Sequence, residues 1–310
     1  MAAQPSIPSQ SLPSLAEKRG TLDRLLGSMG PLLIAYSGGV DSAFLAYAAH
    51  QVLGEKMLAV LADSPSLART QLQDAISFAR EQEIPLEVIV TAELDRKEYA
   101  RNLPDRCFHC KDELFEVMEK LRVERGFDRI AYGVNTNDLG DFRPGQKAAK
   151  LHRIEAPLVD AGLCKDEIRE LARTAGLRIW DKPASACLSS RIEYGRPVTR
   201  EALSAVECGE DALRQLGFQQ IRVRHHGQIV RIELGCNELP RIVAPGMAER
   251  LVATFKELGF TYVTLDLEGF RSGSMNALLP VELLSGNQME VGPSERKSDP
   301  LPAKKDRHMR

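Results

Sequence analysis

The stretch Leu32-Leu33-Ile34-Ala35-Tyr36-Ser37-Gly38-Gly39-Val40-Asp41-Ser42 decides the fold of this chain. Its apolar beginning, Leu32 to Ala35, is typical of a parallel strand that is covered on both faces. Gly38 and Gly39 allow backbone conformations that a Cβ atom would block. Apolar residues then recur at helical spacing as far as a stop signal at Gly54. The stretch therefore predicts a strand, a tight loop and a helix, in that order.

The loop between this strand and helix is suited to a phosphate. Free N–H groups and the positive end of the helix dipole favour an anion there. Two glycines flanked by two serines and an aspartate exceed what a tight turn needs, although an ordinary turn remains the alternative. The loop is not a Walker A motif, because no G-x-x-x-x-G-K-[ST] pattern occurs. It resembles the pyrophosphate loop S-G-G-x-D-S of the ATP pyrophosphatases, which implies ATP-phosphate binding by Ser37, Gly38, Gly39, Asp41 and Ser42.

Composition excludes several classes of protein. The chain has 310 residues, enough for a sizeable core and two domains, and a net charge of −2 gives no basic field for nucleic acid. No apolar run approaches the roughly 18 residues that span a bilayer, and no secretion signal opens the chain. We expect a cytoplasmic protein with a small anionic substrate, whose six cysteines are reduced, reactive or metal-bound.

Outward from the loop, strands alternate with helices. This order predicts a doubly wound parallel α/β sheet over residues 14–195, with strands at 57–61, 86–90, 130–132 and 157–159 and helices at 15–26, 67–82, 111–125 and 165–175. A smaller α+β domain is expected over 196–285, with a helix from an N-cap at Thr199, strands at 220–225, 229–234 and 262–267, and a helix at 248–258. A leader, residues 1–13, and a tail, residues 286–310, have the composition of disordered segments.

Polar residues follow two of the predicted strands. Asp63 and Ser64 come after the second strand and are expected to face the adenosine half of a nucleotide; a simple helix N-cap by Ser64 or Ser66 is the alternative. The loop after the strand at 130–132 contains Asp138, Asp141 and Arg143. Carboxylates and a guanidinium suit Mg²⁺ and phosphates, with a plain Asn/Asp/Gly turn cluster as the alternative.

Two arginines of the smaller domain share a strand face. Arg222 and Arg224 alternate with Val223, and Arg231 lies on the partner strand. Guanidinium groups on one face suit a phosphate, although a solvated strand face is an equally good interpretation.

A second motif narrows the family. The phrase Trp180-Asp181-Lys182-Pro183-Ala184-Ser185-Ala186-Cys187-Leu188-Ser189-Ser190-Arg191, followed by Tyr194-Gly195, resembles the LarE family of ATP-dependent sulfur transferases. The likeness runs from about residue 16 to residue 276. It implies that ATP adenylylates a carboxylate of pyridinium-3,5-biscarboxylic acid mononucleotide, that pyrophosphate leaves, and that sulfur then replaces the activated oxygen. The product belongs to biosynthesis of the nickel-pincer cofactor of lactate racemase.

Members of that family differ in their source of sulfur. In one branch a single cysteine, here Cys187, gives up its own sulfur; other members carry two further cysteines and a [4Fe-4S] cluster that takes up sulfide or another sulfur donor. This chain also has Cys107-x-x-Cys110 and resembles the second kind. Two thiolates at the start of a helix, plus a third from Cys187, would leave one iron open. A zinc site using His109 or His152, a redox disulfide and unrelated core cysteines remain alternatives.

The remaining expectations concern the substrate and the rival functions. Asp41 is expected to hold Mg²⁺, and the mononucleotide is expected to contact Ser190, Arg191, Glu210, Arg222 and Arg224. Cys164, Cys208 and Cys236 are interpreted as structural, and the family implies a homo-oligomer. The nearest rival is a tRNA thiolase, which needs a basic RNA-binding surface that this chain lacks. An amidotransferase-like synthetase and a non-catalytic nucleotide sensor are weaker rivals.

Overall fold

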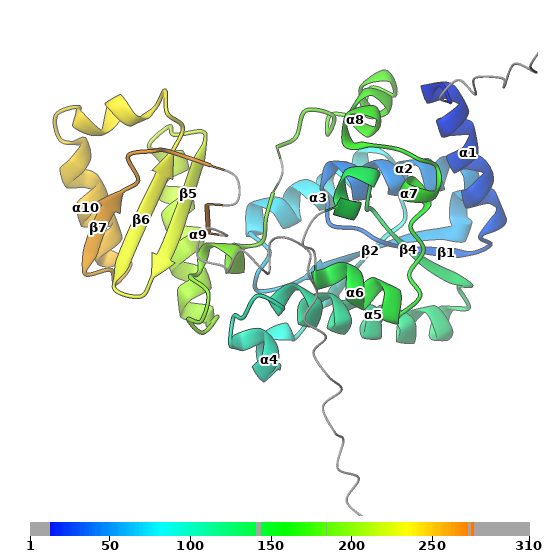
Figure 1. The fold of residues 1–310 in the computed structure, drawn as a ribbon, viewed down its shortest axis with the longest axis horizontal. Coiled ribbons are helices and arrows are strands. Elements are labelled where there is room, and N and C mark those ends of the chain that lie inside the picture. Colours follow the sequence, from blue (N-terminus) through cyan, green and yellow to red (C-terminus); the bar gives the residue numbers. More distant parts are fainter. Residues whose placement is uncertain (1–12, 141–143, 184, 272–273, 276–310) are drawn as a thin grey trace, which may run out of the picture.

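The larger part of the protein is a parallel sheet of four strands. The computed structural model describes residues 13–140, 144–183, 185–271 and 274–275 (Figure 1). The sheet has the order β3-β2-β1-β4, with β1 (Leu32–Ala35), β2 (Met57–Asp63), β3 (Leu86–Val90) and β4 (Arg129–Tyr132). Leu32 is in register with Met57 on one side and Arg129 on the other, so β1 lies inside the sheet. The predicted α/β class is confirmed.

Helices cover both faces of this sheet, as Figure 1 shows. Side chains alternate along β1, so Leu32 and Ile34 pack on one face and Leu33 on the other. Burial of each leucine contributes about 1.5–3 kcal/mol. The first face is covered by α1 (Leu15–Ser28), α2 (Val40–Leu53), α3 (Arg69–Glu81) and α8 (Lys165–Thr174), and the second by α5 (Arg106–Arg125) and α6 (Pro144–Leu151).

The strand predicted at 157–159 is wrong. Residues Pro157–Asp160 form the short helix α7, with Pro157 in its first turn. Proline lacks the N–H that a strand ladder needs, and its fixed φ suits the first turn of a helix. At the β4 edge of this sheet, the described residues add one parallel bridge, between Ala131 and Glu155.

Two helices differ from the prediction near the cysteines. α5 begins at Arg106, five residues before the predicted start, so Cys107 and Cys110 lie inside its first turns. α6 falls within and beyond the segment expected to be a polar loop. Asp141 and Arg143 lie outside the described residues. The short elements of this part are η1 (Gly54–Lys56), η2 (Glu93–Asp95), α4 (Lys97–Ala100) and η3 (Thr136–Gly140).

A second sheet has the order β5-β6-β7. β5 (Ile221–His226) runs antiparallel to β6 (Ile229–Leu234), which is parallel to β7 (Tyr262–Leu265). α9 (Arg200–Gln215) begins after Thr199, whose Oγ1 accepts a hydrogen bond from the Ala202 N–H at 3.1 Å. α9 and α10 (Met247–Glu257) share an apolar core with the sheet, and η5 (Leu239–Val243) completes this part. The predicted strands and helices of this part are present with small shifts at their ends.

A small apolar cluster joins the two parts. It contains Leu188 of η4 (Leu188–Arg191), Leu203 of α9, Tyr99 of α4 and Ala68 of the segment before α3. Among the described helices none is long and apolar enough to cross a membrane. The proposed boundary between residues 195 and 196 stays a prediction, and the proposed leader and tail fall almost wholly outside the described residues.

Candidate functional site

The Ser/Gly loop joins β1 to the N-terminus of α2, as the sequence predicts. The backbone N–H of Ser37 donates to Ser42 Oγ at 3.1 Å, and Ser42 Oγ donates to the Gly39 carbonyl at 3.1 Å. Gly38 has φ +70°, and a Cβ there would lie 2.5 Å from the Ala75 Cβ of α3. Glycine is therefore required at 38, both by the backbone conformation and by the close packing of α3. The loop therefore lies at a helix N-terminus, a position that favours anions in proteins.

Asp41 meets a cation that the sequence analysis did not identify. Its Oδ2 pairs with Lys165 Nζ at 2.7 Å, whereas Oδ1 is buried without a partner in the described part of the chain. Lys165 is the first residue of α8, and its backbone N–H donates to Asn137 Oδ1 at 2.8 Å. The helix dipole disfavours a cation at that end, so Asp41 compensates an unfavourable position. An unpartnered carboxylate oxygen is the kind of ligand that Mg²⁺ prefers.

The loop after β4 packs directly against the start of α2. A Cβ added to Gly133 would lie 2.5 Å from the Ser42 backbone nitrogen. Asn135 and Asp138 are buried there, and the Asn135 N–H donates to Asp138 Oδ2 at 3.2 Å. Asp138 therefore lies in a loop that packs against the start of α2, next to the Ser/Gly loop.

Asp63 lies at the end of β2, as expected, but it has a protein partner. Its carboxylate pairs with Arg69 of α3, and Arg69 also donates to the carbonyl oxygen of Ser64. The Ser64 hydroxyl donates to Glu93, and Ser66 donates its backbone N–H to Ser64 Oγ at 2.9 Å. Neither serine caps α3, whose N-cap is Ala68. Contact between Asp63 and a nucleotide stays a prediction.

Cys187 lies near Cys107 and Cys110, two cysteines of α5 that are distant from it in sequence. Burial among protein atoms raises the pKa of the Cys110 thiol, and the nearby Glu93, Cys187 and Cys107 raise it further. Cys107 is exposed at the surface, yet the protein atoms around its thiol desolvate it and raise its pKa, with Arg106 opposing and Cys187 adding to the shift. The three thiols are therefore within electrostatic reach of one another. In the residues that the structure describes, no three His, Cys, Asp or Glu side chains converge as a metal site.

Arg106 is a buried cation beside these thiols. It is 3% exposed, and its Nη1 donates to the Ser189 carbonyl at 2.9 Å and to Asn102. Burial lowers the pKa of Arg106, but the nearby Cys187, Cys107, Tyr99 and Tyr194 together outweigh it, so that the pKa is raised. A fixed positive charge favours the thiolate form of neighbouring cysteines. The hydrophobic pattern of the sequence did not point to Arg106, because it gave no sign that α5 begins before residue 111.

The loop that carries Cys187 is held on several sides. Cys187 Sγ lies 3.0 Å from Ser189 Oγ, and the Leu188 N–H donates to the Ser66 carbonyl at 2.8 Å. The Ser190 hydroxyl donates to the Cys187 carbonyl at 2.7 Å. The turn that carries the thiol therefore lies beside the segment that follows β2.

Arg191 and Glu210 bind each other. Arg191 Nε lies 2.9 Å from Glu210 Oε1, with side chains only 1% and 2% exposed. Arg191 Nη1 also donates to the carbonyls of Ala186 and Cys187, at 2.6 and 3.0 Å. The pair thus fastens the Cys187 loop to α9, and a direct contact of either residue with substrate stays a prediction.

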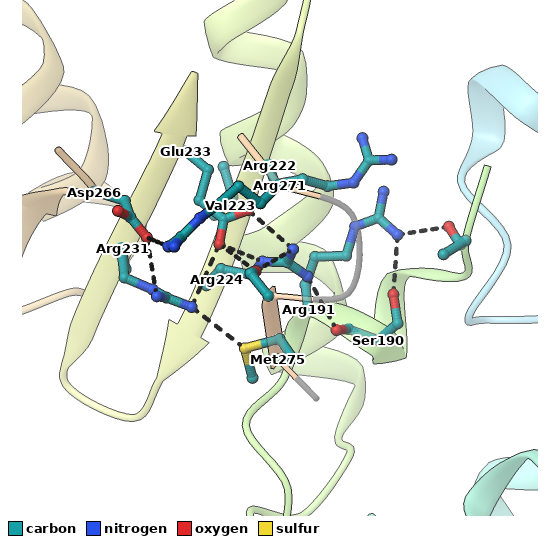
Figure 2. Close-up of polar contacts among 12 residues, drawn as sticks. Ser190, Arg191, Arg222, Val223, Arg224, Arg231, Glu233, Asp266, Arg271 and Met275 are labelled. Carbon is teal, nitrogen blue, oxygen red and sulfur yellow. Dashed lines mark hydrogen bonds and ion pairs between the residues drawn. The ribbon is translucent and has the colours of Figure 1, made fainter. Parts of the chain in front are cut away.

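The strand arginines differ in their pairing (Figure 2). Arg224 pairs with Glu233 at 2.9 Å, and its Nη1 donates to the Ser190 carbonyl at 3.3 Å. Arg231 pairs with Asp266 at 3.0 Å. Arg222 pairs with no carboxylate in the described ranges, and its side chain extends away from Glu233.

Arg222 is the anion-binding candidate of this group. It stacks on Phe270, 4.9 Å from the ring centroid, and donates to the Ile221 carbonyl at 2.8 Å. Partial burial, reinforced by the positive charge of Arg191, lowers the pKa of Arg222 to about 10. A desolvated guanidinium with unused donors gains from a phosphate or carboxylate partner.

Comparison with known proteins gives two groups of relatives. Residues 28–120 match the family model described as NAD synthase. An uncharacterized protein of Synechocystis sp. is 42% identical over 86% of this chain and 99% of its own length. The pyridinium-3,5-bisthiocarboxylic acid mononucleotide synthase of Lactiplantibacillus plantarum is 34% identical over 86% of this chain and 96% of its own. A subunit of the glutamine-hydrolyzing GMP synthase of Methanococcus maripaludis is 29% identical over 47% of this chain and 50% of its own.

Proposed function

The chain belongs to the LarE family of ATP-dependent sulfur transferases, within the ATP pyrophosphatases, and from this membership we propose that it makes thiocarboxylates from pyridinium-3,5-biscarboxylic acid mononucleotide. ATP adenylylates each carboxylate in turn, and sulfur then displaces AMP. The product is the bisthiocarboxylate used for the nickel-pincer nucleotide of lactate racemase. The proposal includes a homo-oligomeric, cytoplasmic enzyme without a nucleic-acid partner.

One observation carries this proposal beyond family membership. The Cys187 loop hydrogen-bonds to the Ser66 carbonyl, in the segment that follows β2, while β1 leads into the ATP loop next to it in the same sheet. Ligands of such sheets bind outside the carboxyl ends of the strands. In this proposal the Cys187 thiol acts near the edge of the sheet where the adenylate would form.

The residues around the ATP loop suit the first step. A carboxylate oxygen of the substrate attacks the α-phosphorus, and the bond to the β-phosphate bridging oxygen breaks. Loop N–H groups and the Lys165 ammonium offset the charge that develops on the departing pyrophosphate. Asp41 would hold Mg²⁺, which would neutralise further phosphate charge there. Adenylylation removes the negative charge that protects a carboxylate from nucleophiles and supplies AMP as leaving group.

Arg222 and Arg224 are proposed to orient the mononucleotide. Arg222 has unused donors, and Arg224 is fixed by Glu233 close to the backbone of Ser190. Ser190 is three residues from Cys187. A phosphate bound by these guanidinium groups would therefore be held next to the loop that carries the sulfur chemistry.

Cys107, Cys110 and Cys187 are proposed to hold the [4Fe-4S] cluster. Three thiolates are the donors that such a cluster needs, and the three thiols and Arg106 influence one another's pKa values, although the described residues do not bring the thiols together as a formed metal site. The bound cluster would supply a sulfide ligand as the sulfur that replaces oxygen. The alternative within the same reaction is a single turnover in which Cys187 gives up its own sulfur.

Anaerobic reconstitution tests the cluster. We expect iron–sulfur absorbance and several turnovers with sulfide in the unaltered protein, and loss of both in Cys107→Ala. Cys208→Ala, which changes an exposed cysteine of α9, is the matched control and should behave as wild type. Absence of iron–sulfur absorbance in the unaltered protein, or many turnovers by Cys107→Ala, would show that the cluster is not the donor.

A further inference from the structure

Helix α3 contacts both the ATP loop and the segment that leads to Cys187. Ala75 packs against Gly38, and the Ala75 carbonyl accepts a hydrogen bond from the Tyr36 hydroxyl at 2.8 Å. One residue earlier, Asp74 binds Lys182, and one helical turn earlier Gln71 binds the Ser185 hydroxyl. Residues 71, 74 and 75 lie on one side of a helix. The two segments are therefore fastened to the same helix face.

The Lys182 side chain contacts both the ATP loop and α3. Its Nζ donates to the Gly38 carbonyl at 2.8 Å and also to the Asp74 carboxylate. The lysine side chain is 20% exposed. The Gly38 carbonyl belongs to the peptide whose plane also fixes the direction of the Gly39 N–H, one of the donors expected to face phosphate. The ammonium therefore sets the orientation of a phosphate-binding peptide.

The Asp74 carboxylate, which binds Lys182, has a lowered pKa. Partial burial alone would raise the pKa of Asp74, but hydrogen bonds from Lys182 and Arg178 outweigh it and leave the pKa below its usual range. Arg178 Nη1 lies 2.5 Å from Asp74 Oδ1. Asp74 is thus a fixed anion shared by two cations, of which only Lys182 reaches the ATP loop.

The chain from Lys182 to Cys187 is short. Five residues span at most about 17 Å even when fully extended. Two contacts hold described residues of this stretch: Ser185 binds Gln71, and the Leu188 N–H donates to the Ser66 carbonyl. A displacement of Lys182 is therefore expected to shift the Cys187 thiol, because few residues separate the two.

We propose that Lys182 is a positioning residue that couples occupancy of the ATP loop to the placement of Cys187. When phosphates fill the loop, the Gly38 peptide is fixed, and Lys182 and the segment behind it are fixed with it. Cys187 is then held in place when the acyl adenylate forms, which limits the time in which water can hydrolyse the adenylate. This inference rests on the proposed function, because it assumes both an ATP loop and a sulfur-transferring cysteine.

Hydrogen exchange tests the coupling without turnover. With Mg²⁺ and α,β-methylene ATP, which is not cleaved between the α and β phosphates, we expect protection of residues 36–42 and of 182–190 in the wild type. Lys182→Met should keep the first protection and lose the second. Arg178→Met is the matched control, since Arg178 shares Asp74 without touching the ATP loop, and it should keep both.

The outcomes separate this inference from the proposed function. Protection of 36–42 alone in the wild type, or equal protection of 182–190 in Lys182→Met, would overturn the coupling and leave ATP binding intact. Absence of protection at 36–42 in the wild type would instead overturn the ATP site itself.

Product ratios give a second readout. In Lys182→Met, AMP released per thiocarboxylate formed should rise about 10-fold, the size expected when a reacting group loses its alignment. Lys182→Arg, which keeps a cation, should restore much of the ratio, and Arg178→Met should leave it unchanged. A higher KM for ATP in Lys182→Met with an unchanged ratio would mean that Lys182 only binds phosphate, and would contradict the coupling.

Discussion

Two charged pairs near the site have opposite characters. Asp41 and Lys165 have side chains 17% and 31% exposed, so water and ligands can reach the pair. Arg191 and Glu210 are almost fully buried. An open pair can exchange partners at small cost, whereas a buried pair cannot lose one member without leaving a charge in a low-dielectric interior. The first pair is therefore suited to binding and release, and the second to holding a loop in place.

Replacement of Lys165 tests the open pair. Lys165→Met removes the ammonium expected to meet the pyrophosphate, so the KM for ATP should rise about 10-fold, equivalent to roughly 1.4 kcal/mol. Steady-state pyrophosphate release at varied ATP measures this. Lys18→Met is the matched control, because Lys18 pairs with Glu167 of the same helix, also at 2.7 Å. Equal KM values for the two variants would rule out a role for Lys165 in ATP binding.

Replacement of Glu210 tests the buried pair. Glu210→Gln leaves the Arg191 charge buried without its counter-ion, and the free energy of unfolding should fall by about 3–5 kcal/mol. Urea denaturation followed by circular dichroism measures the loss. Glu170→Gln, which breaks the exposed pair with Arg173, should leave the midpoint unchanged. A small effect of Glu210→Gln would mean that Arg191 finds another partner.

At the scale of elements, the loop after β4 packs closely against the start of α2. Gly133→Ala would place a Cβ 2.5 Å from the Ser42 backbone nitrogen, and backbone atoms at a helix start cannot move aside like a flexible side chain. The variant should lower both the unfolding temperature and ATP affinity, measured by thermal denaturation with and without Mg²⁺ and ATP. Gly20→Ala in α1, with nothing within 4 Å, should be neutral or stabilising. A Gly133→Ala protein with normal ATP affinity would show that the loop need not stay against α2.

The elements around the ATP loop were predictable because their signals are local. The apolar run of β1, the glycines and the helical repeat of α2 are written in consecutive residues, and the structure confirms them. The prediction of a strand at 157–159 was wrong because three apolar residues do not distinguish a short strand from a helical turn. The start of α5 was missed because its first turn shows no apolar periodicity. The burial of Arg106 there depends on contacts with Asn102 and Ser189.

The residues that connect the site were not predictable. Lys165, Lys182 and Arg106 are single basic residues without a local motif of their own that specifies contact with Asp41, Gly38 and Ser189. Each contact joins segments more than 80 positions apart in sequence, so it depends on the packed fold. Strand register places Arg222 opposite Glu233 and Arg224 opposite Arg231, so the alternation of side chains did not reveal the diagonal pairing of Arg224 with Glu233.

At the scale of the whole molecule, the two sheets contribute different parts. The parallel sheet carries the ATP loop, the small sheet carries the arginines, and η4 with Cys187 at its start connects them. Separate binding sites should respond separately to mutation. This division follows from the fold and leads to a selective prediction.

Arg222→Met should raise the KM for the mononucleotide about 10-fold or more and leave the KM for ATP unchanged, because a charge-assisted contact is lost only at the second site. Pyrophosphate release at varied concentrations of each substrate measures both constants. Arg250→Met, on the exposed part of α10, is the control and should change neither. A parallel rise in both constants for Arg222→Met would contradict separate sites.

The most direct test of the proposed sulfur transfer is the mass of the nucleotide product. Reconstituted protein is incubated anaerobically with ATP, Mg²⁺, sulfide and pyridinium-3,5-biscarboxylic acid mononucleotide, and the products are analysed by mass spectrometry together with AMP and pyrophosphate. We predict a mononucleotide in which one and then two oxygens are replaced by sulfur, with one AMP and one pyrophosphate per replacement and an intact Cys187. AMP and pyrophosphate with no sulfur in the product, or no pyrophosphate at all, would contradict it.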